Sequence, residues 1–149
     1  MSTPLIRPLR PDERAAWDPL WQGYLAFYGA TVAPEVTDLT WARLHDPAEP
    51  MHALVAEQED GTVIGLVHYI FHRSTWTAGP YCYLQDLFTA KAARGQGAGR
   101  ALIEAVYAAA REAGASRVYW LTQEANVTAR ALYDTLADRP GFIQYRKVF

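Results

Sequence analysis

The sequence predicts a mixed α/β (α+β) fold, in which helices cover both faces of one central sheet. Three observations support this expectation. The apolar pattern changes between strand and helix periods in the order strand, two helices, three strands, helix, strand, helix, strand. Hydrophobic residues make up 50% of the chain and charged residues 20%, which is a globular composition. At 149 residues the chain suits one domain better than two, so we expect a single domain over residues 1–149.

Composition also limits the partners and the compartment. The formal net charge of −2 lacks the basic excess of nucleic-acid-binding proteins, so no nucleic-acid partner is expected. No stretch approaches the roughly 18 consecutive apolar residues of a membrane span, and the polar start does not have the pattern of a secretory signal. The single cysteine, Cys82, excludes an internal disulfide and fits a reducing compartment. We therefore expect a soluble cytoplasmic protein without membrane contact.

The first half of the chain should contain three strands and two helices. Residues 5–9 have the pattern of a short strand, and a helix follows from Asp12 until Gly29 stops it. The apolar stripe of this helix consists of Trp17, Leu20, Trp21, Tyr24, Leu25 and Tyr28. The stripe is most simply core packing, although Tyr24 or Tyr28 could line a substrate cleft. A second helix begins at Glu35 or Thr37 and ends near Leu44. Strands at 51–57 and 62–71 then flank a hairpin turn at 59–61.

The second half of the chain alternates between strands and helices. A strand at 81–89 leads into a glycine-rich loop, and an alanine-rich helix at 101–113 ends at Gly114. A strand is expected at 116–122. Asn126 has the position of a helix N-cap, and the helix that follows runs to about Leu136. After the turn at Pro140 and Gly141, residues 142–148 alternate enough to predict a closing strand.

The glycine-rich loop is a candidate phosphate site. Alternate glycines allow a tight turn and a close approach of backbone N–H groups, and the following helix points its positive end at the same place. The P-loop pattern fails because no Lys-Ser/Thr pair follows, and the dinucleotide fingerprint fails in both registers. An ordinary glycine turn before a helix remains the alternative. The loop consists of Arg94, Gly95, Gln96, Gly97, Ala98, Gly99 and Arg100.

These letters match the acyl-CoA loop Arg/Gln-x-x-Gly-x-Gly/Ala, filled by Arg94, Gly97 and Gly99. The preceding strand YLQDLFT, the following helix, the strand VYWLT and the run from Asn126 to Tyr133 complete two cofactor motifs in order. Together they resemble the GNAT superfamily of N-acetyltransferases. Within it, the run VYWLTQEANVTARALYDTLA looks most like the branch of diamine acetyltransferases and yeast-type histone and polyamine acetyltransferases.

The resemblance implies a mostly antiparallel sheet with a splayed strand pair and acetyl-CoA as co-substrate, without a metal. It implies that backbone groups of Leu87, Phe88 and Thr89 pair with the pantetheine arm. The loop from Gly95 to Arg100 would bind the diphosphate, with Asn126 near the pantetheine. We therefore expect a homodimeric enzyme that acetylates a primary amine (a small amine, a polyamine or a lysine-like amine) by direct attack in a ternary complex. The alternative is a non-catalytic module that binds or senses acetyl-CoA.

The same resemblance assigns candidate catalytic residues. Tyr133 would be the general acid that protonates the leaving thiolate, although a core aromatic would have the same spacing. Diamine acetyltransferases have Glu-Asp where this chain has Gln85 and Asp86, and an amide cannot accept the amine's proton. Asp86 is therefore a candidate for a catalytic role and equally for a structural one.

The acceptor site is less defined in the sequence. Five carboxylates could select a polycation: Glu35, Asp38, Asp46, Glu49 and Glu124. Four aromatic side chains could instead form a box for an amine: Tyr24, Tyr28, Trp41 and Trp76. His68 and His72 share a strand face, but two imidazoles make a weak case for a metal, and no metal site is predicted.

Overall fold

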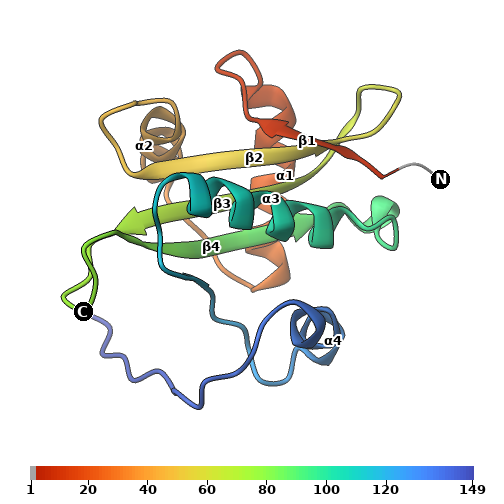
Figure 1. Cartoon of the computed structure of the whole chain (residues 1–149). Helices are drawn as coiled ribbons and strands as arrows, with labels where there is room; N and C mark the ends of the chain where they lie inside the picture. Colours follow the sequence, from red (N-terminus) through yellow and green to blue (C-terminus); the bar gives the residue numbers. More distant parts are fainter. Residues whose placement is uncertain (1–2) are drawn as a thin grey trace.

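The computed structural model describes residues 3–149 and contains one five-stranded sheet in the order β1-β2-β3-β4-β5 (Figure 1). The first four strands pair antiparallel, and β4 and β5 pair parallel. The mostly antiparallel sheet predicted from the sequence is therefore confirmed. The strands are β1 (Leu5–Pro8), β2 (Met51–Glu57), β3 (Val63–His72), β4 (Tyr81–Thr89) and β5 (Val118–Tyr119).

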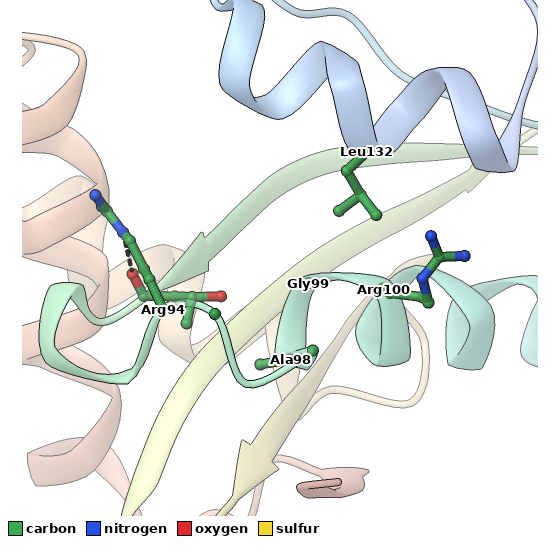
Figure 2. Close-up of a pocket in the computed structure, with 8 residues that line it drawn as sticks. Arg94, Ala98, Gly99, Arg100 and Leu132 are labelled. Carbon is green, nitrogen blue, oxygen red and sulfur yellow. Dashed lines mark hydrogen bonds between the residues drawn. The ribbon is translucent and has the colours of Figure 1, made fainter.

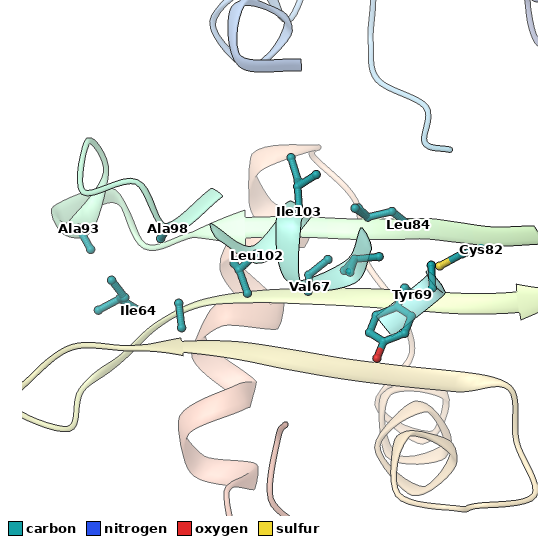
Figure 3. Packing of buried hydrophobic residues seen from close by; sticks show 12 residues of the cluster. Ile64, Val67, Tyr69, Cys82, Leu84, Ala93, Ala98, Leu102 and Ile103 are labelled. Atoms are coloured by element: carbon teal, nitrogen blue, oxygen red, sulfur yellow. The ribbon is translucent and has the colours of Figure 1, made fainter. Parts of the chain in front are cut away.

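Helices cover both faces of the sheet, as expected. The helices are α1 (Arg14–Phe27), α2 (Pro34–Leu44), α3 (Ala98–Glu112) and α4 (Val127–Leu136), with a short 3-10 helix η1 (Lys91–Ala93). Buried residues of α1 pack with Val55 and Leu66 of the sheet on one face, and those of α3 pack on the other. Figure 3 shows Leu102 and Ile103 of α3 beside Val67 and Leu84 of the strands. In Figure 1, α4 lies beyond the edge formed by β4.

The glycine loop changes where α3 begins. The helical pattern predicted a start at Ala101, but α3 begins three residues earlier, at Ala98. Gly97 is its N-cap residue and has a φ of 81°, in the left-handed region that glycine occupies at low cost. Because the loop turns sharply at Gly97, the helical conformation can begin directly after it.

A β-bulge in β4 determines the direction of Asp86. His68 pairs with Asp86 and Tyr69 with Leu84, so Gln85 is the extra residue of the bulge. Strict alternation would place Leu84 and Asp86 on the same face of the sheet. With the extra residue, Leu84 packs in the α3-side core, whereas Asp86 meets His68 beneath α1. Gln85 itself is exposed.

The parallel strand pair separates soon after it forms. β4 and β5 pair only at Cys82 with Val118 and at Tyr83 with Tyr119. The strand predicted at 116–122 is therefore shorter than expected, because the later residues leave β4 and have no neighbouring strand to bond. Within residues 3–149, no strand covers the same edge of β4 from Leu84 to Thr89. This is the splayed strand pair that the sequence predicted.

The predicted closing strand at 142–148 is wrong. Residues 137–149 contain no helix or strand, and Phe142 and Ile143 are exposed at 82% and 76%. An alternating pattern predicts a strand only where a neighbouring strand offers an edge, and β5 is two residues long. The segment therefore runs as exposed extended chain towards the C terminus (Figure 1).

No helix in residues 3–149 combines the length and the hydrophobicity needed to cross a lipid bilayer.

Candidate active site

The loop before α3 has the geometry of an anion site. Gly95 and Gly97 both have left-handed backbone angles, with φ of 86° and 81°. The first intrahelical bond of α3 runs from the Ala101 N–H to the Gly97 carbonyl, 3.0 Å away. The earlier N–H groups of the first turn have no acceptor within the helix, and the helix dipole adds partial positive charge at this end. This combination favours a phosphate group.

A pocket of about 250 Å³ lies over this loop (Figure 2). Figure 2 shows Leu132 reaching from α4 towards Gly99, so α4 supplies one wall. A Cβ added at Gly99 would lie 3.5 Å from the Leu132 side chain, which is an ordinary contact. The pocket is lined by Thr89, Arg94, Gly95, Gly97, Ala98, Gly99, Arg100 and Leu132.

Two arginines flank the pocket. The Arg94 Nε donates to the Thr89 carbonyl at 3.3 Å, and its guanidinium lies 5.9 Å from the centre of the Phe88 ring. Arg100 donates to the Thr135 hydroxyl of α4 at 2.9 Å. Gln96 has a different role in this structure, because its side-chain oxygen accepts a bond from Gln58 at 3.0 Å. The loop therefore has fixed positive charge on two sides of the backbone N–H groups.

The open edge of β4 leads from this pocket into the splay. Leu87 packs against the α3-side core and Phe88 against the α1-side core, so both side chains are held by the two layers. Their backbone edge on the β5 side has no partner strand among residues 3–149. An extended ligand could pair with such an edge as an added strand. The predicted cofactor residues Leu87, Phe88 and Thr89 thus lie beside the predicted loop.

Tyr133 lies on α4, and Asn126 is the residue at which this helix begins. Burial raises the pKa of the Tyr133 phenol to about 12, and the nearby Tyr28 of α1 adds to this. The phenol therefore keeps its proton at neutral pH. Its ring meets Trp120 edge-on, with centroids 5.4 Å apart. Asn126 is the N-cap residue of α4, but its side chain makes no capping bond and is available for other partners.

Asp86 lies between β3 and α1 in a mostly buried position. Its Oδ2 is 2.9 Å from His68 Nδ1. Burial first, and then the charge of Asp86, raise the pKa values of Tyr24, Tyr28 and Tyr83. The negative charge of Asp86 thus acts on two phenols of α1 and one of β4.

The structure divides the predicted acceptor residues. Tyr24 and Tyr28 face Asp86, but Trp41 packs against Trp17 at a centroid distance of 5.2 Å in the core. Trp76 is 77% exposed in the loop between β3 and β4. The expected aromatic box is therefore not formed by these four residues.

The predicted carboxylates do not converge. Asp38 is paired with Arg14 at 2.7 Å, and Glu49 lies 4.0 Å from Arg43. The Asp46 carboxylate accepts the Ala48 N–H at 2.9 Å, so it closes a local turn. Glu35 lies in the first turn of α2, and Glu124 is exposed before α4. Asp86, which was not among these five, is instead the carboxylate whose charge acts on Tyr24, Tyr28 and Tyr83.

Two histidines that share a strand face have separate surroundings. His68 is buried beside Asp86, whereas the His72 Nε2 lies 2.7 Å from the Tyr119 hydroxyl in an exposed position. Among residues 3–149, no group of three or more potential ligands could hold a metal ion. Sequence reasoning missed the contact between His68 and Asp86. No local signal in the sequence marks it, because the pair depends on the register of β3 with β4 and on the bulge at Gln85.

Comparison with known proteins identifies the family. The profile of the acetyltransferase (GNAT) family matches residues 17–137. The chain belongs to this family. It is 35% identical over 144 residues to the D-amino-acid N-acetyltransferase of Saccharomyces cerevisiae, covering 96% of this chain and 89% of that protein. It is also 35% identical over 95 residues to the thialysine N-epsilon-acetyltransferase of Sus scrofa, covering 59% and 55%.

A solved structure shares the fold of this GNAT protein. The ribosomal-protein-alanine N-acetyltransferase from Brucella melitensis biovar Abortus 2308 superimposes with a TM-score of 0.81. The match covers 97% of this chain and 99% of that chain at 21% identity. The family and these relatives make the protein an N-acetyltransferase, and the family implies acetyl-CoA as its co-substrate. The left-handed glycine loop and the open β4 edge fit a diphosphate and an extended arm.

The loop yields a first prediction. Gly97→Val should reduce acetyl-CoA affinity at least tenfold, because a β-branched residue disfavours φ of 81° and the loop must change shape. Isothermal titration calorimetry with acetyl-CoA measures the change.

Gly61→Val provides the matched control. Gly61 has a φ of 87° in the hairpin between β2 and β3, and no atom lies within 4 Å of an added Cβ at either glycine. Both variants should lose about 1–2 kcal/mol of stability. Only Gly97→Val should lose acetyl-CoA affinity. Unchanged affinity in folded Gly97→Val protein would contradict the assignment of the loop.

Proposed function

We propose that this GNAT enzyme transfers the acetyl group of acetyl-CoA to a primary amine by direct attack in a ternary complex. The observation that carries the proposal is the arrangement around the open edge of β4. Tyr133 approaches from α4, and Asp86 with its three tyrosines lies on the α1 side. The glycine loop lies at the end of the same strand. This arrangement supports an acid, a carboxylate and a phosphate site distributed along one strand.

The chain has separate groups for each part of the co-substrate. Backbone N–H groups from Gly95 to Arg100 would bind the diphosphate, with Arg94 and Arg100 adding charge. Leu87, Phe88 and Thr89 would pair with the pantetheine arm through the open edge, and Asn126 would bond near it. Bound acetyl-CoA supplies an activated acetyl thioester. The hydrogen bond from Arg94 to the Thr89 carbonyl is long, at 3.3 Å. When the diphosphate binds, the Arg94 side chain would therefore release this carbonyl.

Tyr133 is the proposed general acid. A leaving thiolate needs a proton, and a phenol with a pKa raised to about 12 still holds one at every pH at which the enzyme is assayed. Burial of the phenol limits competing bonds with water. The hydroxyl would therefore donate its proton as the thiolate departs.

Asp86 is proposed to bind or deprotonate the amine. An alkylammonium with a pKa near 10.4 must lose a proton before attack, at about 1.4 kcal/mol per pH unit. Asp86 is the only carboxylate among the predicted candidates that faces the tyrosines of α1 and β4. One carboxylate suits one ammonium, so we expect no strong selection for polycations. Names of the relatives support small acceptors, because D-amino acids and thialysine both carry a primary amine.

A panel of amines tests the function. Thiol release should occur with small monoamines and lysine-like amines at a kcat/KM at least comparable with that for spermidine. The rate should rise with pH towards the pKa of the free amine, because Tyr133 keeps its proton over this range. No turnover with any amine, together with tight acetyl-CoA binding, would favour a non-catalytic binding module. A spermidine kcat/KM a hundredfold above every monoamine, with a plateau by about pH 7, would contradict the single-ammonium site.

Removal of the Tyr133 hydroxyl tests the acid. Tyr133→Phe should lower kcat by about 10²–10⁴-fold and leave acetyl-CoA affinity nearly unchanged. Tyr107→Phe is the control, because its hydroxyl donates to the Leu136 carbonyl of α4 at 2.9 Å and has no proposed chemical role. Steady-state kinetics should show a loss in the first variant only. A Tyr133→Phe enzyme at the wild-type rate would leave Tyr133 as a packing residue.

We also propose a cytoplasmic homodimer. Its support is the exposed segment after α4, where Phe142, Ile143 and Tyr145 are 76% to 90% exposed. Phe142 lines one hollow with the 77% exposed Trp76, so the apolar surface extends onto the loop between β3 and β4. Large contiguous apolar surfaces usually mark an interface. A second copy of the chain is the proposed partner.

The proposed cytoplasmic location is supported by the cysteine. The free, buried Cys82 is compatible with a reducing compartment.

Light scattering after size exclusion tests the dimer. The wild-type protein should elute with twice the chain mass of 16.7 kDa at micromolar concentration. Ile143→Asp should shift it to the monomer, because a charge would be buried in the contact. Leu5→Asp changes a 57% exposed residue on β1 and should not alter the mass. A monomeric wild-type protein would overturn the proposal.

A further inference from the structure

Three buried side chains form a hydrogen-bonded row from α1 to β4. The Trp17 indole Nε1 lies 3.0 Å from His68 Nε2, and His68 Nδ1 lies 2.9 Å from Asp86 Oδ2. Trp17, His68 and Asp86 are exposed at 0%, 4% and 8%. They come from three elements, α1, β3 and β4, so the row depends on the packing of the helix on the sheet.

The row defines the proton positions on His68. An indole N–H can only donate, so His68 Nε2 must accept. The single proton of the neutral imidazole is therefore on Nδ1, which donates to Asp86. A second proton on Nε2 would face the indole N–H, with two donors 3.0 Å apart. Trp17 thus favours the neutral ring in one tautomer.

Asp86 consequently has only neutral partners. Within residues 3–149 no lysine or arginine forms an ion pair with it, and its hydrogen-bonding partner is the His68 ring. A buried carboxylate without a cation is unfavourable. Other partly buried carboxylates of the protein are paired with a cation: Arg7 forms ion pairs with Glu13 at 2.7 Å and with Glu57 at 3.0 Å. The missing cation at Asp86 fits an incoming ammonium.

We propose that His68 is a positioning residue for the acceptor amine and that Trp17 sets its tautomer. His68 holds the Asp86 carboxylate in place and, because it stays neutral, leaves the negative charge for the ammonium. This inference rests on the proposed function. The inference deepens the proposed function because it limits the acceptor site to one ammonium group, whose neighbours would include Tyr24, Tyr28 and Tyr83.

Trp17→Phe tests the tautomer. Without the indole N–H, no donor faces Nε2, so the hydrogen-bond geometry no longer opposes a proton there. An imidazolium would pair with Asp86 and compete with the ammonium. The titratable groups near this row are Asp86 and Tyr83 from β4 and Tyr24 and Tyr28 from α1, and the phenols stay protonated over the tested range. The Arg14 guanidinium of α1 lies 5.6 Å from the centre of the Trp17 ring and keeps its charge throughout.

The readout is the KM for a monoamine between pH 8 and pH 5.5. In Trp17→Phe this KM should rise at least fivefold more than in the wild type as the pH falls, while acetyl-CoA affinity stays unchanged. Trp21→Phe is the matched control. Trp21 is a buried tryptophan of the same helix, but its indole donates to the Thr37 hydroxyl at 3.4 Å. An equal pH response in both variants would overturn the role of Trp17.

Substitution of His68 tests positioning. His68→Leu should raise the amine KM by about 10–100-fold, the range of a lost hydrogen bond to a charged group, with a smaller change in kcat. His68→Asn can place an amide donor near the position of Nδ1. On a logarithmic scale, its rise in amine KM should be at most half of the rise in His68→Leu. If His68 had only a structural role, the two variants would lose equal stability and would have the same amine KM. That result would overturn the proposal.

Nitrogen NMR of histidine-labelled protein gives an independent readout. His68 should show protonated Nδ1 and unprotonated Nε2 in the wild type, and protonated Nε2 would contradict the proposed tautomer.

The outcomes of these experiments also separate the proposed function from the proposed role of His68. Absence of turnover in the wild type contradicts the proposed function. Wild-type turnover with an unchanged amine KM in His68→Leu contradicts this inference alone.

Discussion

The separation of β4 from β5 is the constraint on which the candidate site depends. The two parallel strands pair at only two positions, so the edge of β4 from Leu84 onward is open. An open edge inside a protein is unfavourable unless another group bonds it. Here the open edge leads directly into the glycine loop and α3, where we propose the anion site. One break in the sheet would therefore supply both the proposed slot for an extended ligand and the proposed phosphate site.

The bulge at Gln85 changes which face of the sheet the following residue of β4 points to. It turns Asp86 towards α1, while Leu84 and Leu87 remain in the core beneath α3. The strand thus keeps its packing on one face and presents a carboxylate on the other. Because α4 approaches from the far side of the splay, Tyr133 and Asp86 are supplied by different layers.

The charges of the site are distributed along β4. The loop carries Arg94, Arg100 and the helix dipole, whereas Asp86 has the His68 ring as its partner and no arginine or lysine paired with it in residues 3–149. Such a division suits two substrates of opposite charge, an anionic cofactor arm at one end and a cationic amine near the middle. The ion pairs of Arg7 and Arg14 lie on other elements and do not neutralise either part.

The sequence alone determined the order of elements as far as the last helix, the glycine loop and the family motifs, because these depend on local spacing and on residue types with strong backbone preferences. It predicted β2 and β4 with their observed bounds and placed Tyr133 on the last helix. It could not predict that residues 142–148 would lack a strand partner or that Trp41 and Trp76 would lie apart. The row from Trp17 through His68 to Asp86 was also decided only in three dimensions. Each of these features depends on the register, the bulge and the contact between distant elements, which no local pattern encodes.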